Sequence, residues 1–163
     1  MKTLLVLRHA KSSWKNSALD DRERPLNERG RRDAPRMGEL VREFGLIPDV
    51  VISSDAVRAR LTAEAVAEAA RYAGEILLDA HLYLAGPADI VSVLRTVREN
   101  ADSVMIVGHN PGLEELVEQL TGEPHDLPTA ALAKIVLPIH QWRDLKRSTR
   151  GTLLGHWRPK GLT

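Results

Sequence analysis

The chain of 163 residues contains no cysteine. This absence excludes disulfide bonds, thiolate–zinc sites and cysteine nucleophiles. Its six histidines lack the i, i+4 helical spacing and the carboxylate clustering that indicate a metal site, so we expect no metal and no cofactor. Four of these histidines are assigned to structure or surface: His81, His125, His140 and His156.

The chain also lacks an excess of charge of either sign. A net charge of +1 gives no global field for holding nucleic acid, and the short basic run 143–150 is interpreted as a solvated loop. Aromatic residues make up only 4% of the chain, and no basic strand face interleaves with them. We therefore expect Tyr83, Trp142 and Trp157 to lie in the core rather than form a base-stacking platform.

No hydrophobic run reaches membrane-spanning length. The N-terminus leads directly into a strand-length apolar run, without the hydrophobic region and cleavage site of a signal peptide. These observations predict a cytoplasmic protein without a membrane or nucleic-acid partner.

The apolar residues that are present predict one α/β domain over residues 1–163. An apolar content of 43% suits a single core at this length. Helical patterns separate the first five strand-like runs, and the last two are joined through the polar stretch 141–151. This order predicts a three-layer α/β/α sandwich, with a mostly parallel sheet of about five to six strands and helices on both faces. The expected strands are at about 3–8, 49–53, 75–78, 103–108, 133–139 and 152–157.

Three helices carry recognisable end signals. For the helix after the first strand, Asn27 is the expected cap, and Pro35 should kink or interrupt the helix because proline removes a backbone hydrogen bond. The helix at about 56–72 is expected to have Ser54 or Asp55 as its N-cap. The helix after the strand at 103–108 is expected to begin with Asn110 as N-cap and Pro111 at its first position, and to end at Gly122.

Two predicted strands deliver histidines at their ends. Arg8 and His9 end the first strand, His109 follows the strand at 103–108, and Arg58 lies in the first turn of the helix at 56–72. Because the carboxyl ends of parallel strands meet at one edge of a sheet, we expect these four side chains to share a crevice. Two guanidinium groups there form a fork-shaped receptor for a doubly charged phosphoryl group.

The imidazoles can do more than bind. A neutral histidine is a nucleophile near pH 7 and can accept a phosphoryl group as a covalent intermediate. Arg8 and Arg58 would disfavour imidazolium and keep such a ring neutral. The other histidine, when protonated, can donate to a phosphoryl oxygen. On these grounds alone, either His9 or His109 could take either role.

Three segments in register resemble the histidine phosphatase superfamily, a phosphoglycerate mutase-like fold family. They are residues 7–12 (LRHAKS), 53–63 (SSDAVRARLTA) and 107–112 (VGHNPG). Residues 21–30 (DRERPLNERG) extend the match before the first helix. More narrowly, the chain is similar to the small phosphohistidine phosphatase (SixA-type) branch.

The resemblance implies roles for four residues. His9 matches the phosphorylated nucleophile and Arg8 the arginine before it, while Arg58 matches the second arginine and His109 the second histidine. These four are the candidate catalytic residues, and Arg8, Arg58 and His109 would also bind substrate. The implied activity is that of a metal-independent phosphatase.

Two further residues are candidates for binding substrate. Lys11 follows the proposed nucleophile and could line the mouth of the site, although a solvated loop is an equal interpretation. Asn110 is interpreted first as a helix cap, with a second role at the phosphate.

The chain departs from the family pattern at two points. Ala10 replaces a glycine that many relatives have after the nucleophile, which requires negative φ there. No residue clearly matches the glutamate that mutase-like members use as general acid, and the candidates by location are Asp20, Asp21, Asp79 and Asp89.

A missing acid bears on the substrate. Imidazole, with a pKa of about 6.5, leaves phosphohistidine with far less protonation than an alkoxide needs to leave an ester. The chain also has no insertion large enough for a lid domain, so the crevice could admit a phosphohistidine displayed on a protein. Two alternatives stay open: a phosphatase of a small phosphomonoester or nucleotide-related phosphate, and a non-catalytic module that binds phosphate or phosphohistidine.

Overall fold

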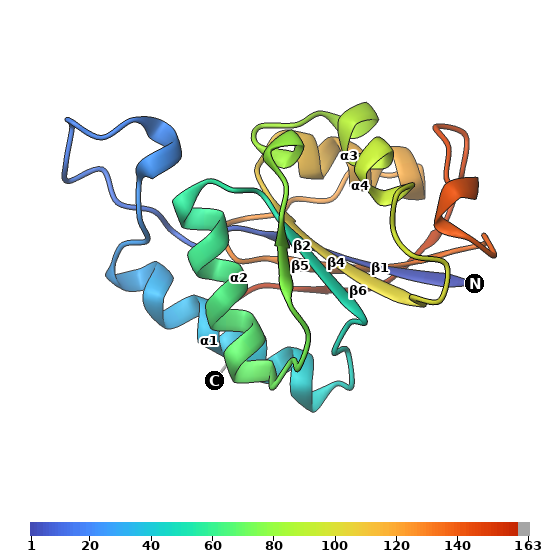
Figure 1. Cartoon of the computed structure of the whole chain (residues 1–163), viewed down its shortest axis with the longest axis horizontal. Coiled ribbons are helices and arrows are strands. Elements are labelled where there is room, and N and C mark those ends of the chain that lie inside the picture. The colour runs from blue at the N-terminus through green and yellow to red at the C-terminus, as the bar shows by residue number, and fades with distance from the viewer. Residues whose placement is uncertain (160–163) are drawn as a thin grey trace.

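The computed structural model describes residues 1–159 and contains a six-stranded mixed sheet between two layers of helices (Figure 1). The elements follow the predicted alternation along the chain. They are β1 (Lys2–Arg8), α1 (Glu28–Glu43), β2 (Val50–Ser53), α2 (Val57–Ala70), β3 (Ile76–Leu78), α3 (Pro87–Leu94), β4 (Ser103–Gly108), α4 (Gly112–Thr121), β5 (Leu132–Leu137) and β6 (Thr152–Trp157), with short 3-10 turns η1 (Asp21–Glu23), η2 (Ala80–Leu82) and η3 (Trp142–Asp144).

The strand order is β3-β2-β4-β1-β5-β6. Strands β3, β2, β4 and β1 are parallel, whereas β5 runs antiparallel to both β1 and β6. The sheet is therefore mostly parallel, and the predicted α/β sandwich is confirmed. In the register of β1 with β4, Arg8 lies opposite Gly108. The residues that follow these two strands, His9 and His109, consequently leave the sheet side by side.

Alternate residues of β1 pack into two separate cores. Leu4 and Val6 join the cluster formed by α3 and α4, and Leu5 and Leu7 join the cluster formed by α1 and α2. Both faces of the sheet are thus covered, as Figure 1 also shows. Burial on both faces explains why the central strands read as continuous apolar runs rather than alternating ones.

The expected interruption of α1 at Pro35 is wrong. The helix runs unbroken from Glu28 to Glu43, and the Asn27 side chain caps it as predicted by accepting from the Gly30 N–H at 2.9 Å. Proline removes one hydrogen bond, but the helix gains more by burying Met37 and its apolar neighbours against α2. Tertiary packing therefore overrides the local preference.

The starts of α2 and α4 also differ from the prediction. Ala56 occupies the N-cap position of α2. Ser54 Oγ accepts from the Ala56 N–H and also lies 2.8 Å from His109 Nε2, while Asp55 is paired with Arg22. Helix α4 begins one residue later than expected, with Pro111 as its N-cap residue. Its predicted end is confirmed: Gly122 adopts the left-handed conformation at φ 81°.

The three aromatic residues expected in the core are buried to different degrees. Trp142 is fully buried and donates from Nε1 to the Ala101 carbonyl at 2.8 Å, as a core tryptophan should. Trp157 is half-buried and packs against the α1–α2 core. Tyr83 is half-buried as well and packs against the same core, and at the carboxyl end of the sheet its ring also contacts His109. Within residues 1–159, none of the helices has the length and apolar character needed to cross a membrane.

Candidate active site

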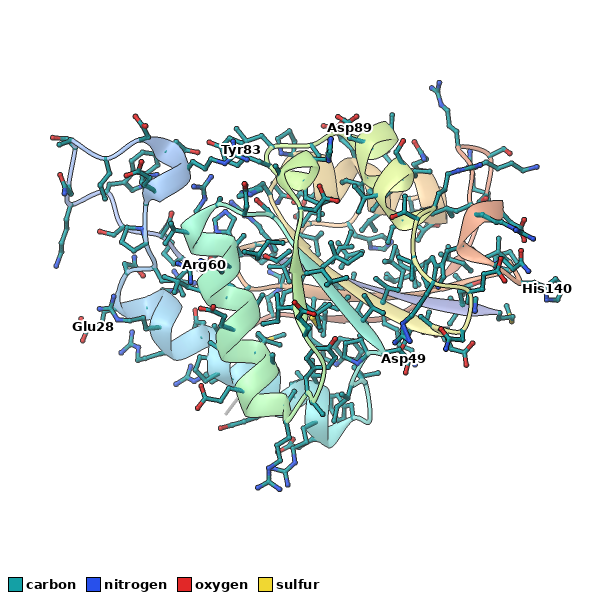
Figure 2. The ribbon with its side chains drawn as sticks, in the orientation of Figure 1. Glu28, Asp49, Arg60, Tyr83, Asp89 and His140 are labelled. Atoms are coloured by element: carbon teal, nitrogen blue, oxygen red, sulfur yellow. The ribbon has the colours of Figure 1, made fainter. Side chains whose placement is uncertain are left out.

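The structure brings the four sequence-predicted residues together at the carboxyl edge of the sheet. Arg8 ends β1, His9 follows it, His109 follows β4, and Arg58 is the second residue of α2. The two imidazole rings lie 5.2 Å apart between centroids. Figure 2 places Tyr83 at this end of the molecule and His140, an exposed residue, at the opposite end.

The backbone around His9 sets its tautomer. Its Nδ1 lies 2.7 Å from the Ala10 carbonyl oxygen, which can only accept a hydrogen bond, so Nδ1 carries the proton. The lone pair of a neutral ring is then on Nε2. The Ala10 N–H in turn donates to Thr62 Oγ1 at 2.9 Å, which holds this turn against α2. Ala10 does not have positive φ, so alanine is tolerated where relatives have glycine.

His9 is held neutral near pH 7. Burial of the ring, only 7% exposed, is the main cause that lowers its pKa to about 4. The charges of Arg58, Arg8 and Arg24 add to this effect. The predicted influence of the arginines is therefore present, although burial outweighs it.

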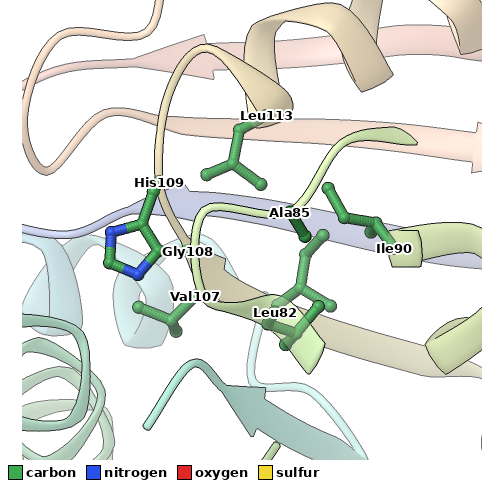
Figure 3. A pocket seen from close by; sticks show the side chains of 8 residues that line it. Leu82, Ala85, Ile90, Val107, Gly108, His109 and Leu113 are labelled. Carbon is green, nitrogen blue, oxygen red and sulfur yellow. The ribbon is translucent and has the colours of Figure 1, made fainter. Parts of the chain in front are cut away.

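His109 is also held neutral. Its pKa falls to about 3, mainly through burial and then through His9 and Arg58. The ring Nε2 lies 2.8 Å from Ser54 Oγ, whereas the buried Nδ1 has no partner. Leu82 and Leu113 line a small, mostly apolar pocket next to His109 (Figure 3). Any hydrogen bond that His109 donates near pH 7 consequently comes from a neutral ring, whereas the sequence analysis expected a protonated one.

Each arginine keeps one edge of its guanidinium free. Arg58 donates from Nη1 to the Asp21 carbonyl at 2.6 Å and from Nη2 to Asp21 Oδ2 at 2.9 Å. These two bonds use the donors at the end of the guanidinium group. Arg8 donates from Nη1 to the Leu127 carbonyl at 3.1 Å. Within residues 1–159, nothing pairs with the buried Nε atoms of Arg8 and Arg58. Buried unpaired donors are rare, so the site is built for an anion that would complete them.

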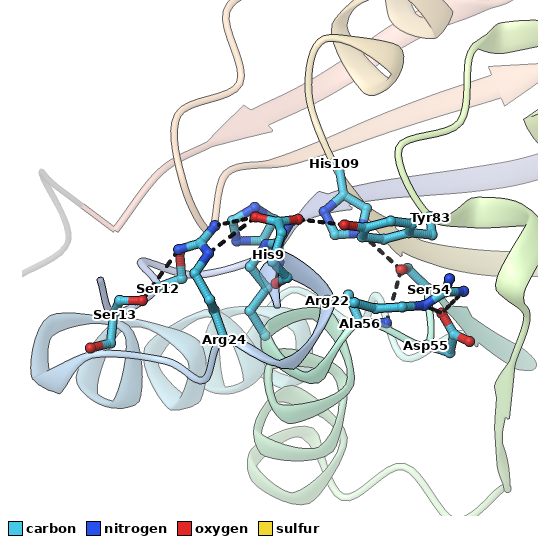
Figure 4. Close-up of polar contacts among 12 residues, drawn as sticks. His9, Ser12, Ser13, Arg22, Arg24, Ser54, Asp55, Ala56, Tyr83 and His109 are labelled. Atoms are coloured by element: carbon cyan, nitrogen blue, oxygen red, sulfur yellow. Dashed lines mark hydrogen bonds and ion pairs between the residues drawn. The ribbon is translucent and has the colours of Figure 1, made fainter. Parts of the chain in front are cut away.

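Sequence reasoning missed Arg24, Tyr83 and Ser54 as neighbours of the site. Arg24 is 7% exposed and donates from Nη1 to Ser12 Oγ at 2.7 Å. The Tyr83 ring meets His109 edge-on at 5.4 Å, and its hydroxyl donates to Asp21 Oδ2. Figure 4 shows His9 between Arg24 and Tyr83. For Arg24 a signal existed in the segment 21–30, whereas Tyr83 and Ser54 have none in the periodicity of the chain.

Of the four candidate acids, Asp21 is the one that contacts Arg58. Burial acts to raise the pKa of Asp21, but hydrogen bonds from Tyr83, Arg58 and Arg24 outweigh burial and hold the pKa well below its usual value. Asp21 is therefore an anion that orients arginines, and it has no proton to donate near pH 7. Asp79 accepts from the backbone N–H of His81 instead, Asp20 is exposed, and Asp89 lies in the first turn of α3.

The two further binding candidates lie at the margin of the site. The Lys11 side chain is exposed, and its carbonyl accepts from the Asn27 N–H at 2.9 Å. Asn110 donates from Nδ2 to the Leu127 carbonyl at 2.8 Å and accepts from the Glu114 N–H at 3.3 Å. The Asn110 amide thus links the start of α4 to the Leu127 carbonyl, which Arg8 also contacts. This role is structural.

Between residues 1 and 159, no three or more His, Cys, Asp or Glu side chains are grouped so that they could hold a metal ion. The positive charge of the site comes instead from guanidinium groups. A mostly parallel sheet that collects arginines and histidines at its carboxyl edge defines an α/β protein with a cationic site suited to an oxyanion such as a phosphoryl group.

Comparison with known proteins makes the class specific. Residues 4–82 match the model of the histidine phosphatase superfamily, branch 1. An uncharacterized protein of Mycobacterium tuberculosis is 35% identical over 155 residues, covering 86% of this chain and 92% of that protein. The chain belongs to the histidine phosphatase superfamily.

Solved structures agree over nearly the whole chain. A structure from Agrobacterium tumefaciens that carries the name phosphohistidine phosphatase SixA has a TM-score of 0.83 at 29% identity, covering 97% of this chain and 98% of that one. One of the same name from Nakamurella multipartitia has a TM-score of 0.85 at 25% identity, covering 97% and 96%. A phosphoglycerate mutase of Streptomyces avermitilis is 44% identical over 69 residues, which span only 27% of the mutase.

Proposed function

We propose that this chain is a metal-independent phosphatase that acts through phosphorylated His9, with phosphohistidine on proteins as its substrate. The observation that carries the proposal is the set of buried, unpartnered nitrogens around His9: Nε of Arg8, Nε of Arg58 and Nδ1 of His109. They come from three separate segments of the chain. A phosphoryl group would complete all of them at once.

The first step is transfer to His9. The Nε–H and the remaining Nη2–H of each arginine point in parallel, so each guanidinium can bind two phosphoryl oxygens side by side. Nε2 of neutral His9 then attacks phosphorus in line. A new P–N bond forms on His9 while the P–N bond of the substrate breaks. The second nitrogen of the substrate ring takes up a proton from water, so that the ring leaves as neutral imidazole.

Ser54 prepares His109 for its part in the transfer. Ser54 Oγ accepts from the Ala56 N–H at 3.2 Å, so its own proton is available to His109 Nε2. The proton of the neutral ring then lies on Nδ1, the unpartnered atom, where it can donate to a phosphoryl oxygen as negative charge grows there. Loss of one such preorganised donor typically lowers the rate by about a hundredfold or more. In the second step, water attacks phospho-His9, releases inorganic phosphate and restores the ring.

The carboxylates favour a nitrogen leaving group. The pKa of Asp21, the carboxylate that contacts Arg58, is held below its usual value, so Asp21 has no proton for an alkoxide. Imidazole, with a pKa of about 6.5, needs far less help to leave. Phosphoramidate cleavage therefore suits this site better than ester cleavage, and the names of the SixA-type structures agree with that substrate class.

A substrate panel tests the proposal. Turnover of a protein carrying phosphohistidine is compared with turnover of a phosphoserine peptide and of small sugar phosphates, each with the native chain and with His9→Ala. We expect kcat/KM to favour the phosphohistidine protein clearly, and the variant to lose this activity. Preference for the sugar phosphates, or unchanged activity in His9→Ala, would refute the proposal.

A further inference from the structure

Leu84 has a conformation that folding stability alone does not explain. Its φ is 49°, in the left-handed region that costs a branched side chain energy, yet the side chain is 57% exposed. Glycine would adopt this backbone without strain, and a polar residue would avoid exposing hydrocarbon. Leu84 follows Tyr83 directly, so this exposed leucine stands at the edge of the cluster around His109.

Trp14 is a second large apolar side chain exposed beside the site. It is 73% exposed, and one face of its ring lies against the Arg24 guanidinium, whose carbon is 3.5 Å from the ring centroid. Arg24 is fixed in turn by Ser12 and by Asp21 Oδ1, at 2.7 Å and 3.1 Å. The indole is thus held in place from behind while most of its surface stays in water.

The two segments meet across the site. Tyr83 contacts the segment between β1 and α1 twice, through its hydroxyl on Asp21 and through the Arg22 guanidinium, which stacks 4.5 Å from its ring centroid. His9 lies between Arg24 and Tyr83 (Figure 4). Trp14 packs on Arg24, and Leu84 is the next residue after Tyr83, so both belong to the segments that border the site. We call this pair the apolar rim.

We propose that the apolar rim is the docking surface for the polypeptide around the phosphohistidine, and that it selects protein substrates over small ones. The inference rests on the proposed function. A phosphoryl group displayed on a folded protein reaches His9 only if the surrounding surface meets the entrance, whereas a small phosphate enters without touching it. The partner surface should be apolar where it meets the rim and carry acidic residues opposite the exposed Lys11 and Lys15, whereas Arg22 is already paired with Asp55.

Leu84→Gly is the sharpest test, because it removes the side chain and relieves the backbone conformation at once. Trp14→Ser removes the other half of the rim. Leu154→Ser is the matched control, since Leu154 is 58% exposed on β6, away from the site. Steady-state kinetics are measured on a phosphohistidine-bearing protein domain and on inorganic phosphoramidate.

We expect each rim variant to raise KM for the protein substrate by about tenfold, the effect of losing about 1.4 kcal/mol of binding, with kcat unchanged. Kinetics on phosphoramidate should stay as in the native chain, and the control should match it on both substrates. An unchanged KM for the protein substrate, or an equal loss of kcat/KM on both substrates, would refute the docking role of the apolar rim. The proposed function would stay intact in either case. Failure of the native chain to hydrolyse the phosphohistidine protein would overturn both.

Discussion

The protonation of His9 offers a quantitative test of how burial prepares this site. Burial is the main cause that lowers its pKa to about 4, and three arginine charges reinforce it. Because the neutral ring is the nucleophile, the reactive fraction should rise with pH through about 4 and level off above pH 5. An ordinary histidine, with a pKa of about 6.5, would still be mostly protonated there.

The two cases differ most clearly near pH 5. A pKa of about 4 leaves roughly 90% of the His9 rings neutral at that pH, whereas a pKa of about 6.5 leaves about 3%. The difference is about thirtyfold in the fraction that can accept a phosphoryl group. It also affects stability: the unfolded chain binds more protons between about pH 4 and 6.5, so the free energy of unfolding should decrease as pH falls through this window.

NMR titration measures the ring directly. The Cε1–H resonances of the uncomplexed protein are followed from pH 8 to pH 4, and His9→Ala and His109→Ala assign the two buried rings. Circular dichroism at each pH checks that the protein stays folded. We expect neither resonance to titrate above pH 5. A midpoint near 6.5 for His9 in the folded protein would refute the reasoning from burial.

Three further predictions follow from the geometry. Asp21→Asn should lower kcat/KM at least tenfold, because Arg58 loses the charged partner that orients it. The control Asp20→Asn changes an exposed neighbour and should leave kcat/KM unchanged. Equal activities of the two variants would contradict the orienting role of Asp21. Gly112→Ala should reduce thermal stability strongly, since its Cβ would lie 1.7 Å from a backbone carbonyl, whereas Gly86→Ala meets open space; calorimetry compares them, and equal melting temperatures would argue against this packing. Activity should persist in EDTA because guanidinium groups supply the positive charge, and its loss on chelation would contradict this mechanism.

Much of this fold could be predicted because its signals are local. Burial on both faces makes β1 and β4 continuous apolar runs, and parallel strands bring their ends to one edge of the sheet. His9 and His109 could therefore be placed together from sequence alone. Arg58 followed because the start of α2 lies at the same edge.

The rest depends on contacts between distant segments, which leave no periodic pattern. The local pattern allows Ser54 or Asp55 as a helix cap, and it does not indicate that the Ser54 hydroxyl meets His109, 55 positions away in sequence. The aromatic character of Tyr83 predicts its packing against the core, but not that its hydroxyl reaches Asp21, 62 positions away in sequence. Pro35 was expected to interrupt α1, but packing against α2 maintains the helix. In each case tertiary partners decided what the local sequence left open.

The central claim is that His9 accepts the phosphoryl group through Nε2. Rapid-quench labelling with a phosphohistidine protein as donor, followed by mass spectrometry and NMR of the trapped adduct, tests it most directly. We predict an adduct on His9 Nε2 that survives alkali, is lost in acid, and does not form in His9→Ala. An adduct on His109, or one stable to acid, would contradict the account.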